Sequence, residues 1–311
     1  MSMKQVIIAL IVSLFPAMML AVPVQAEAIS SQSEQPVEVE ERWNLATKNM
    51  LEKKYAEAIP ILHEYVEGDI VYSMAAKVKL GEVYFAQGLN ENGIIKADKL
   101  KQSYKWNRDA YTQGMALGFL PQEDGSLENG FLPHRLGYLC ELGAGNEQID
   151  SPIDSSTCAV HWYKLAAEEG RGLSMARLGY IYSDGLYGTE RAPELAYNYF
   201  RSALVQPEFQ ETELLPETSL AIAMLIIDSR WSAEPNKNAV PHLKVAADGG
   251  IPYAKYILGI LYERGLFGVS KDPKQAATLK AEARLSLPSG AITILERLID
   301  TRTLSGEQNE K

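Results

Sequence analysis

The sequence contains few of the residues that usually mark a catalytic or metal-binding centre. Its 311 residues include 2 Cys and 4 His, and the histidines are scattered along the chain. It has no H-E-x-x-H, C-x-x-C, G-x-S-x-G or Walker-type motif, and no Ser is followed three residues later by Lys. These absences argue against the common metalloproteases, thiol oxidoreductases, α/β-hydrolases, P-loop enzymes and serine β-lactamases. We therefore expect no catalytic residue, no cofactor and no metal.

The chain is also short of positive charge. It has 30 Lys and Arg against 40 Asp and Glu, which gives a net charge of -10 at pH 7. A nucleic-acid-binding protein needs a basic surface that can replace the counterions of the phosphate backbone. We expect no nucleic-acid partner.

Only one long apolar run is present, and it lies near the start of the sequence. Lys4 supplies a positive charge, residues 6–20 are apolar, and residues 24–26 end in Ala. This pattern is typical of a secretory signal peptide, here cleaved after Ala26. The alternative is a membrane anchor, for which the run has marginal length, and Pro16 and Pro23 favour cleavage. We expect an exported protein without a membrane span, located in the periplasm of a Gram-negative bacterium, with secretion left open.

A Leu-Gly pair recurs along the rest of the chain. It stands at Leu80-Gly81, Leu136-Gly137, Leu178-Gly179 and Leu258-Gly259, with a degenerate Leu220-Ala221 between the last two. The fullest copies, at 178–188 and 258–268, share the form L-G-x-x-Y-x-x-G-L-aromatic-G. Glycine inside a helix costs about 1 kcal/mol relative to Ala. Its repeated use predicts a neighbouring helix that passes too close for a side chain.

A second pattern of small and aromatic residues interleaves with the first. Its clearest copy is A-x-x-W-Y-x-x-A-A-x-x-G at 159–170, with related copies at 196–203, 239–250 and 276–283 and an earlier version at 103–114. Spacings of three and four place these residues on one stripe of a helix. Periodic self-similarity of this kind indicates a repeat array.

The two alternating patterns resemble the Sel-one-like repeat (SLR) family, a branch of the tetratricopeptide-like α/α solenoids. The resemblance covers about residues 72–285 and implies an all-α fold, a right-handed α/α superhelical solenoid of helix-turn-helix repeats. The fourth unit departs most, because Pro216 stands where the family has Ala and Ala221 replaces Gly.

The expected organisation follows from these assignments. It comprises a signal peptide at 1–26, a flexible segment at 27–38, a tetratricopeptide-like helix hairpin at 39–70, the repeat array at 71–287, a capping helix at 288–302 and a polar tail at 303–311. Irregular segments at 119–133, 143–157 and 206–216 are expected to form inserted loops, which in repeat proteins often lie on the binding face.

The two cysteines, Cys140 and Cys158, are expected to form a disulfide. An even count in an exported chain favours a bridge. Cys140 is predicted in the last turn of one helix and Cys158 in the first turn of the next, so the hairpin brings them close. A bridge closing about 19 residues stabilises by roughly 3 kcal/mol in the chain-entropy model. A redox-active pair and two free thiols are the alternatives.

Candidate partner-binding residues lie around each Leu-Gly pair. The residue before the Leu and the residue two after it are three apart, and therefore adjacent on a helix. The resemblance implies that these first helices line a concave surface. The candidates form three pairs: Lys79 and Glu82, Arg135 and Tyr138, and Arg177 and Tyr180. Corresponding positions further on are Ser219 and Ile222, and Ile257 and Ile260.

Arg and Tyr are enriched in binding hot spots. We therefore predict one patch made by Arg135, Tyr138, Arg177 and Tyr180, suited to a partner with an anionic or carboxylate-bearing segment. The alternative is that Arg177 and Tyr180 only pack between repeats.

The resemblance implies a non-enzymatic scaffold or adaptor that binds a protein or peptide partner, in envelope assembly or in regulation of signalling. Two other functions stay open. One is a hydrolase acting on peptidoglycan or β-lactams, since some cysteine-bridged family members have been linked to β-lactams. The other is a secreted host-interaction effector.

Overall fold

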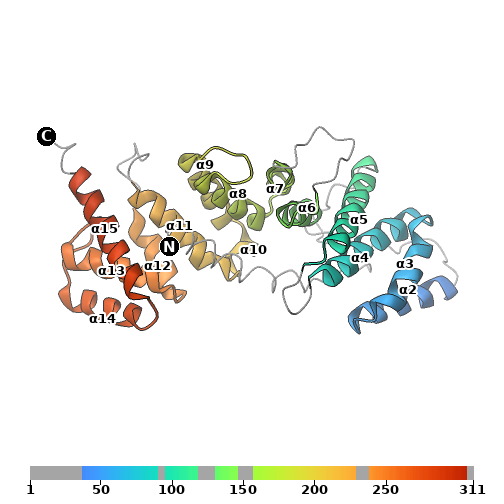
Figure 1. Ribbon diagram of the computed structural model, residues 1–311, viewed down its shortest axis with the longest axis horizontal. Coiled ribbons are helices and arrows are strands. Elements are labelled where there is room, and N and C mark those ends of the chain that lie inside the picture. Colours follow the sequence, from blue (N-terminus) through green and yellow to red (C-terminus); the bar gives the residue numbers. More distant parts are fainter. Residues whose placement is uncertain (1–36, 90–94, 118–129, 146–156, 229–237, 307–311) are drawn as a thin grey trace. The chain divides into compact units, whose positions relative to one another are not determined.

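The computed structural model describes residues 37–89, 95–117, 130–145, 157–228 and 238–306 (Figure 1). These residues form helices labelled α2 to α15 and, within those ranges, no strand beyond an isolated bridge between Leu89 and Ile95. The all-α expectation is confirmed. The expected signal peptide and most of the flexible segment that follows it lie outside the described residues. Over the ranges described, none of the helices is both long enough and apolar enough to cross a membrane.

Most of the helices form antiparallel pairs of consecutive elements (Figure 1). Their bounds are α2 Val37–Leu51, α3 Tyr55–Val66, α4 Ile70–Gly88, α5 Ala97–Ala116, α6 Phe131–Glu141, α7 Cys158–Glu168, α8 Gly172–Asp184, α9 Pro193–Leu204, α10 Pro207–Gln210, α11 Leu214–Ile227, α12 Ala239–Asp248, α13 Pro252–Arg264, α14 Pro273–Arg284 and α15 Ser289–Gly306. The Leu-Gly pairs lie on α4, α6, α8, α11 and α13, and the second pattern lies on α5, α7, α9, α12 and α14.

The chain divides into two compact units. Unit 1 ends at Arg171 and contains the hairpins α2–α3, α4–α5 and α6–α7. Unit 2 begins at Gly172 and contains α8–α9, α11–α12 and α13–α14, followed by α15. Each unit is described by itself below.

The close approach predicted at the Leu-Gly glycines is confirmed. A Cβ atom added to Gly137 would lie 2.7 Å from the ring of Tyr163, and one added to Gly179 would lie 2.5 Å from the ring of Phe200. At Gly259 the same atom would meet the Lys280 side chain at 2.7 Å. In each case the obstacle belongs to the second helix of the same hairpin. The glycine therefore sets the distance between the two helices, and an aromatic ring fills the space in the two central hairpins.

The two fullest copies of the motif also share a turn. Gly185, Tyr187 and Gly188 have positive φ angles of 69°, 51° and 75°, and the corresponding residues after α13 have nearly the same values. In both copies the first glycine and the leucine after it donate N–H bonds to one carbonyl in the preceding helix, Ile181 or Leu261. Positive φ at two glycines and one aromatic residue explains why this turn keeps its glycines.

Two helix N-termini are closed by carboxylates from later in the chain. Glu169, at the end of α7, accepts a 2.8 Å bond from the N–H of Gly130, just before α6. Glu208, in the short α10, accepts a 2.9 Å bond from the N–H of Gly172 at the start of α8. Negative charge at a helix N-terminus is favourable because the exposed N–H groups and the helix dipole attract it.

Several boundaries differ from the sequence-based expectation. Helix α2 begins at Val37, inside the segment expected to be flexible up to residue 38. Helix α6 begins at Phe131, so Phe131–Pro133 are helical rather than part of a loop; Pro133 falls in the first turn, where proline is tolerated. The segment 206–216 contains α10, which packs the fully buried Phe209 inside unit 2. Helix α15 continues to Gly306, past the expected end at 302, because no Pro or Gly interrupts it earlier in that stretch.

Candidate partner-binding surface

The candidate residues occupy corresponding positions on the first helices of consecutive hairpins. The two units hold different members of this row. Unit 1 contains Lys79 and Glu82 on α4, and Arg135 and Tyr138 on α6. Unit 2 contains Arg177 and Tyr180 on α8, Ser219 and Ile222 on α11, and Ile257 and Ile260 on α13.

In unit 1, Arg135 is the centre of a buried charged cluster. Only 3% of the residue is exposed, and its guanidinium lies 4.4 Å from the ring centroid of Phe131, one turn earlier on α6. One terminal nitrogen, Nη1, donates to Oε1 of Glu82 at 3.4 Å. The Nε atom is buried and has no hydrogen-bond partner among the residues that the structure describes. A buried guanidinium is stable only when its charge and its N–H groups are matched, and here that match is incomplete.

Lys79, on α4, is a second buried cation of unit 1. It is 7% exposed, and its Nζ atom lies 5.5 Å from the ring centroid of Trp43 on α2. Burial lowers the pKa of Lys79, and the negative charge of Glu82 opposes that shift. No salt bridge to Lys79 is found among the residues that the structure describes. Glu82 is thus the ion-pair partner of Arg135, and its charge also favours the protonated form of Lys79.

Aromatic residues surround this cluster. Tyr138, one turn after Arg135, is 8% exposed, and its ring centroid lies 6.0 Å from that of Phe85 on α4. Trp43 and Phe131 contact the two cations as described above. Neither was singled out as a site residue from the sequence. The position of Phe131, four residues before Arg135 on one helix, is the signal that could have identified it, whereas Trp43 is placed only by the packing of α2.

In unit 2, Tyr180 is a packing residue. It is 9% exposed, and its ring meets that of Phe200 edge to face at a centroid distance of 4.8 Å. Burial raises the pKa of its hydroxyl. Arg177, one turn earlier, is half-buried. This environment favours the packing alternative for Tyr180, while a contribution to binding stays a prediction for both residues.

Further along unit 2 the row becomes uncharged. Ser219 is 1% exposed, and among the residues described its hydroxyl oxygen has no hydrogen-bond partner. Ile222, Ile257 and Ile260 are fully buried. The structure brings Lys79, Glu82 and Arg135 together in unit 1. The single patch predicted to join Arg135 and Tyr138 with Arg177 and Tyr180 draws on both units, and it stays a prediction.

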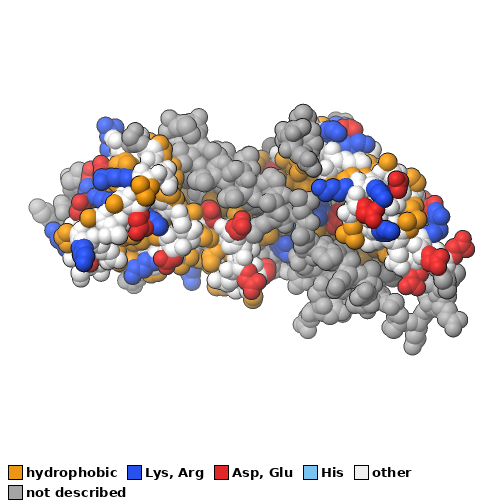
Figure 2. Space-filling view, turned by 90° about the horizontal axis from the view of Figure 1, so that it is seen from below, with side chains coloured by type: hydrophobic (Ala, Val, Ile, Leu, Met, Phe, Trp, Pro, Cys, Tyr) orange, Lys and Arg blue, Asp and Glu red, His pale blue; other side chains and the backbone are white. Residues whose placement is uncertain are grey.

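The surface outside the row carries charges of both signs. On the face in Figure 2, Lys and Arg side chains are interspersed with Asp and Glu over the residues drawn in colour. Several exposed cations have a carboxylate partner, including Lys255 with Glu282 at 2.8 Å and Arg42 with Glu64 at 2.5 Å. The surplus of cations at Lys79 and Arg135 is therefore unlike these exposed pairs.

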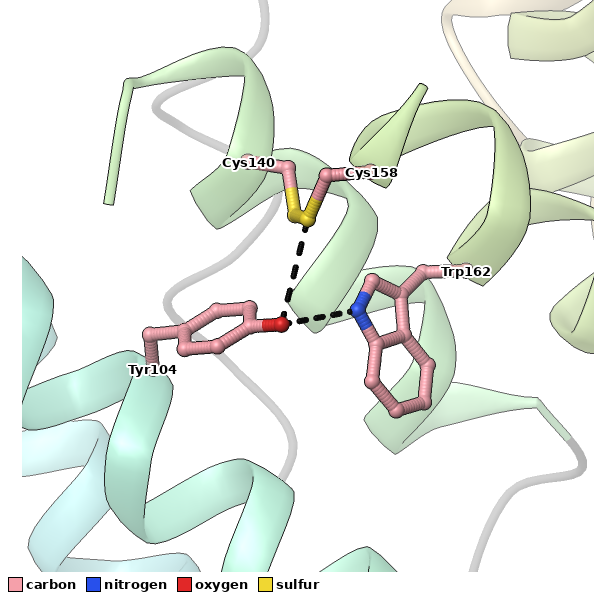
Figure 3. Close-up of a disulfide and its surroundings, with 4 residues drawn as sticks. All are labelled: Tyr104, Cys140, Cys158 and Trp162. Carbon is pink, nitrogen blue, oxygen red and sulfur yellow. Dashed lines mark hydrogen bonds between the residues drawn. A yellow bond between two sulfur atoms is a disulfide. The ribbon is translucent and has the colours of Figure 1, made fainter. Parts of the chain in front are cut away.

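The expected disulfide is present between Cys140 and Cys158. The two residues lie where the sequence placed them, in the last turn of α6 and at the first residue of α7. The Tyr104 hydroxyl lies 3.8 Å from Sγ of Cys158 and accepts a 3.0 Å hydrogen bond from the indole N–H of Trp162 (Figure 3). A Cβ atom at Gly145 would lie 2.6 Å and 2.8 Å from the two sulfurs. The bridge is thus enclosed by α5, α7 and the turn after α6.

The remaining titratable residues do not assemble into a recognisable metal centre. Among the residues described, no group of three or more His, Cys, Asp or Glu side chains is arranged to hold a metal ion. His134 packs against the Tyr163 ring at 5.4 Å. Burial lowers the pKa of His242, and the nearby Arg201 lowers it further.

Comparison with known proteins identifies the repeats. The chain matches the family model of the Sel1 repeat at residues 134–170, 172–204 and 252–279. The first match covers α6 and α7, the second covers α8 and α9, and the third covers α13 with the first half of α14.

Relatives with known sequences or structures carry the same repeat. The sel1-like repeat-containing protein L21 of Acanthamoeba polyphaga mimivirus is 28% identical over 136 residues, which are 43% of this chain and 21% of the viral protein. The chain thus spans about a fifth of that relative's length.

A solved structure with the same fold is found by superposition. A Sel1 repeat protein from Oxalobacter formigenes superposes with a TM-score of 0.54 at 20% identity, over 80% of this chain and 87% of that one. The protective antigen c5321 of uropathogenic Escherichia coli, which has an SLR fold, gives a TM-score of 0.44 at 21% identity, over 81% and 55% of the two chains. The second match is too distant to support an argument.

Proposed function

Because this chain is a Sel1-like repeat protein, we propose that it is a non-enzymatic scaffold that binds a protein or peptide partner along the first-helix row. Sel1 repeats are, in general, protein–protein interaction modules. The finer proposal concerns the surface used, the location in the periplasm and the kind of partner.

The division between constant and variable positions carries the proposal. The Leu-Gly pair recurs on α4, α6, α8 and α13, and the glycine turn recurs after α8 and α13, because they build these hairpins. The row positions instead change from charged in α4 and α6 to aliphatic in α13, although they lie on equivalent parts of equivalent helices. Positions that vary on a constant scaffold are where a repeat protein can acquire specificity.

Crosslinking in the native envelope tests the proposal. A photo-reactive residue at Glu82, the most accessible of Lys79, Glu82 and Arg135, is expected to capture a defined protein after irradiation, to be identified by mass spectrometry. The matched control carries the same residue at Lys255, in unit 2 on α13 outside the row. Equal capture from both positions, or none from Glu82, would contradict binding along the row.

Fractionation of the same cells tests the proposed periplasmic location. Fractionation is expected to recover the protein, shortened after Ala26, from the periplasmic fraction. Recovery from the culture supernatant would instead support a secreted host-interaction protein. Neither outcome depends on which surface binds the partner.

A further inference from the structure

The C-terminal helix α15 is fastened to α13 by polar side chains (Figure 1). The Tyr256 hydroxyl on α13 donates a 2.7 Å hydrogen bond to Oε1 of Glu296 on α15. Arg264, two turns later on α13, forms an ion pair with Asp300 of α15. Arg284 on α14 donates to the same Tyr256 hydroxyl at 3.4 Å. Helix α15 thus supplies two carboxylates, and α13 supplies the groups that bind them.

The apolar part of this contact includes Leu295 and Ile299, one turn apart on α15 and 3% and 0% exposed. The carboxylates of Glu296 and Asp300 directly follow them in the sequence, so one short stretch of α15 carries all four side chains. Helix α13 is not the neighbour of α15 along the chain, because α14 lies between them. The α15 of another copy can therefore make the same contacts, provided that the connection after α14 lets it leave.

The connection between α14 and α15, residues 285–288, has the features of a hinge. Leu285 is 88% exposed, the highest value among the exposed large hydrophobic residues of the described chain. The N–H of Leu287 donates to the carbonyl of Ala283, four residues earlier, so a helical bond continues past the end of α14. Pro288 then interrupts the helix because it has no N–H to donate. A change confined to this connection carries α15 away from α13 and leaves the α13–α14 hairpin intact.

We propose that α15 exchanges between two copies of this chain, so that the α15 of each copy packs on the α13 of the other. The exchanged dimer keeps the contacts of the monomer, because an identical helix supplies them. It also brings the two hinges together, where Leu285 of each copy becomes shielded from water. The inference goes beyond the proposed scaffold function and does not depend on a partner at the first-helix row.

Crosslinking between differently marked chains tests the exchange. One full-length chain carries Arg264→Cys on α13, and the other carries Asp300→Cys on α15. The two are incubated together at high concentration, and a short bismaleimide is then added. A crosslinked dimer on a denaturing gel is expected, because each α15 lies on the α13 of the other chain. Cys140 and Cys158 are bonded to each other and do not take part.

The matched control uses an ion pair inside the hairpin that does not exchange. Lys255 on α13 and Glu282 on α14 lie 2.8 Å apart. A mixture of Lys255→Cys chains and Glu282→Cys chains is expected to give no crosslinked dimer, because both helices stay within their own chain. Equal crosslinking by the two mixtures would show random collision or exchange of a larger part. Absence of a crosslink between positions 264 and 300 would exclude the exchange.

Two variants separate the equilibrium of the exchange from its rate. Leu285→Gln acts on the hinge contact of the dimer and is expected to raise the dissociation constant about tenfold in sedimentation equilibrium. Leu195→Gln on α9, where Leu195 is 39% exposed, is the control and should leave it unchanged. Tyr256→Phe removes a hydrogen bond that both forms contain. The dimer fraction should therefore stay the same, while exchange becomes about fivefold faster.

Several outcomes would overturn the exchange. A protein that stays monomeric at millimolar concentration has no exchanged dimer. An unchanged dissociation constant in Leu285→Gln would show that the hinges do not meet. A changed dimer fraction in Tyr256→Phe would show that α15 makes different contacts in the two forms. None of these results bears on capture of a partner at Glu82, so the scaffold function is tested separately.

Discussion

The two units use one type of hairpin but hold it together differently. In unit 1, the hairpin α6–α7 is closed by the Cys140–Cys158 bond, and its row positions carry buried cations. In unit 2, α8–α9 and α13–α14 are closed by glycine turns of the same backbone form, and the row becomes aliphatic toward α13. In unit 2, α8–α9 and α13–α14 follow the repeat pattern closely, whereas α11–α12 departs from it at Pro216 and Ala221. Unit 1 departs from it, and its departures include a covalent bond that stabilises and a charged cluster that costs stability.

The largest expected effect comes from removing the covalent bond. The double variant C140A/C158A is expected to lose about 3 kcal/mol of unfolding free energy, because the unfolded chain regains the freedom of the closed loop. Urea denaturation measures the loss, and hydrogen exchange locates it. Exchange should accelerate in α6 and α7 while α8 and α9 keep their rates. Equal acceleration of exchange in α6–α7 and in α8–α9 would show that the disulfide does not stabilise the unit 1 hairpin selectively.

The second effect tests the close helix approach in unit 2. Gly179→Ala is expected to cost about 2 kcal/mol, because the new Cβ atom meets the Phe200 ring at 2.5 Å and forces α8 and α9 apart. The control is Gly290→Ala in α15, where a Cβ atom meets nothing within 4 Å. That control should be neutral or slightly stabilising, since Ala favours helix. If both variants have equal melting temperatures, the glycine is not a spacing residue.

The third effect isolates the turn. Gly268→Ala is expected to cost about 1 kcal/mol, because its φ of +78° is unfavourable for any residue with a Cβ atom while the surrounding space is open. The loss is therefore conformational and should be measurable by urea denaturation without a change in the slope of unfolding. Stability equal to that of the unmodified protein would mean that the turn relaxes to another conformation.

The smallest effect concerns the charged cluster, and it has the opposite sign. Lys79→Met is expected to raise the free energy of unfolding by about 0.5 kcal/mol at pH 7, because a buried ammonium is replaced by an apolar side chain of similar length. Burial lowers the pKa of Lys79 from its ordinary 10.5, so the unfolded chain binds more protons than the folded one between the lowered value and 10.5.

The unmodified protein should therefore gain stability as the pH rises through that window, and the advantage of Lys79→Met should shrink. Parallel urea titrations at pH 7 and pH 10 measure this difference. A lower stability of Lys79→Met at pH 7 would show that the cation is a structural requirement, in contrast to the aliphatic row of unit 2.

Several features of the fold could be predicted because each depends on local sequence. Gly179 inside a helix requires a close neighbouring helix. Cys140 and Cys158 lie on either side of the loop that joins the two helices of one predicted hairpin. Both expectations are confirmed. The predicted end of the last helix, residue 302, was wrong, because α15 continues to Gly306. Polar residues without Pro or Gly can continue a helix as readily as they form a tail.

The environment of the candidate residues could not be predicted in the same way. Helical spacing places Lys79 and Glu82 on one face of α4, but it does not say what covers that face. Their burial depends on α2, which supplies Trp43, and on α6, which supplies Arg135. For Tyr180 the sequence leaves open a binding role and a packing role, and its burial against Phe200 favours packing. Helix spacing fixes which side chains are neighbours within an element, whereas exposure depends on contacts between elements.

The two carboxylate caps determine where the array can be divided. The N–H before α6 donates to Glu169, beyond the end of α7, and the first N–H of α8 donates to Glu208 in α10. A fragment that stopped at the end of α9 would therefore contain the complete α8–α9 hairpin and still lack the group that closes the start of α8. For dividing the array into modules, α10 therefore has to be kept with the α8–α9 hairpin that precedes it. The natural joint for removing or exchanging that module lies after Gln210, not after Leu204.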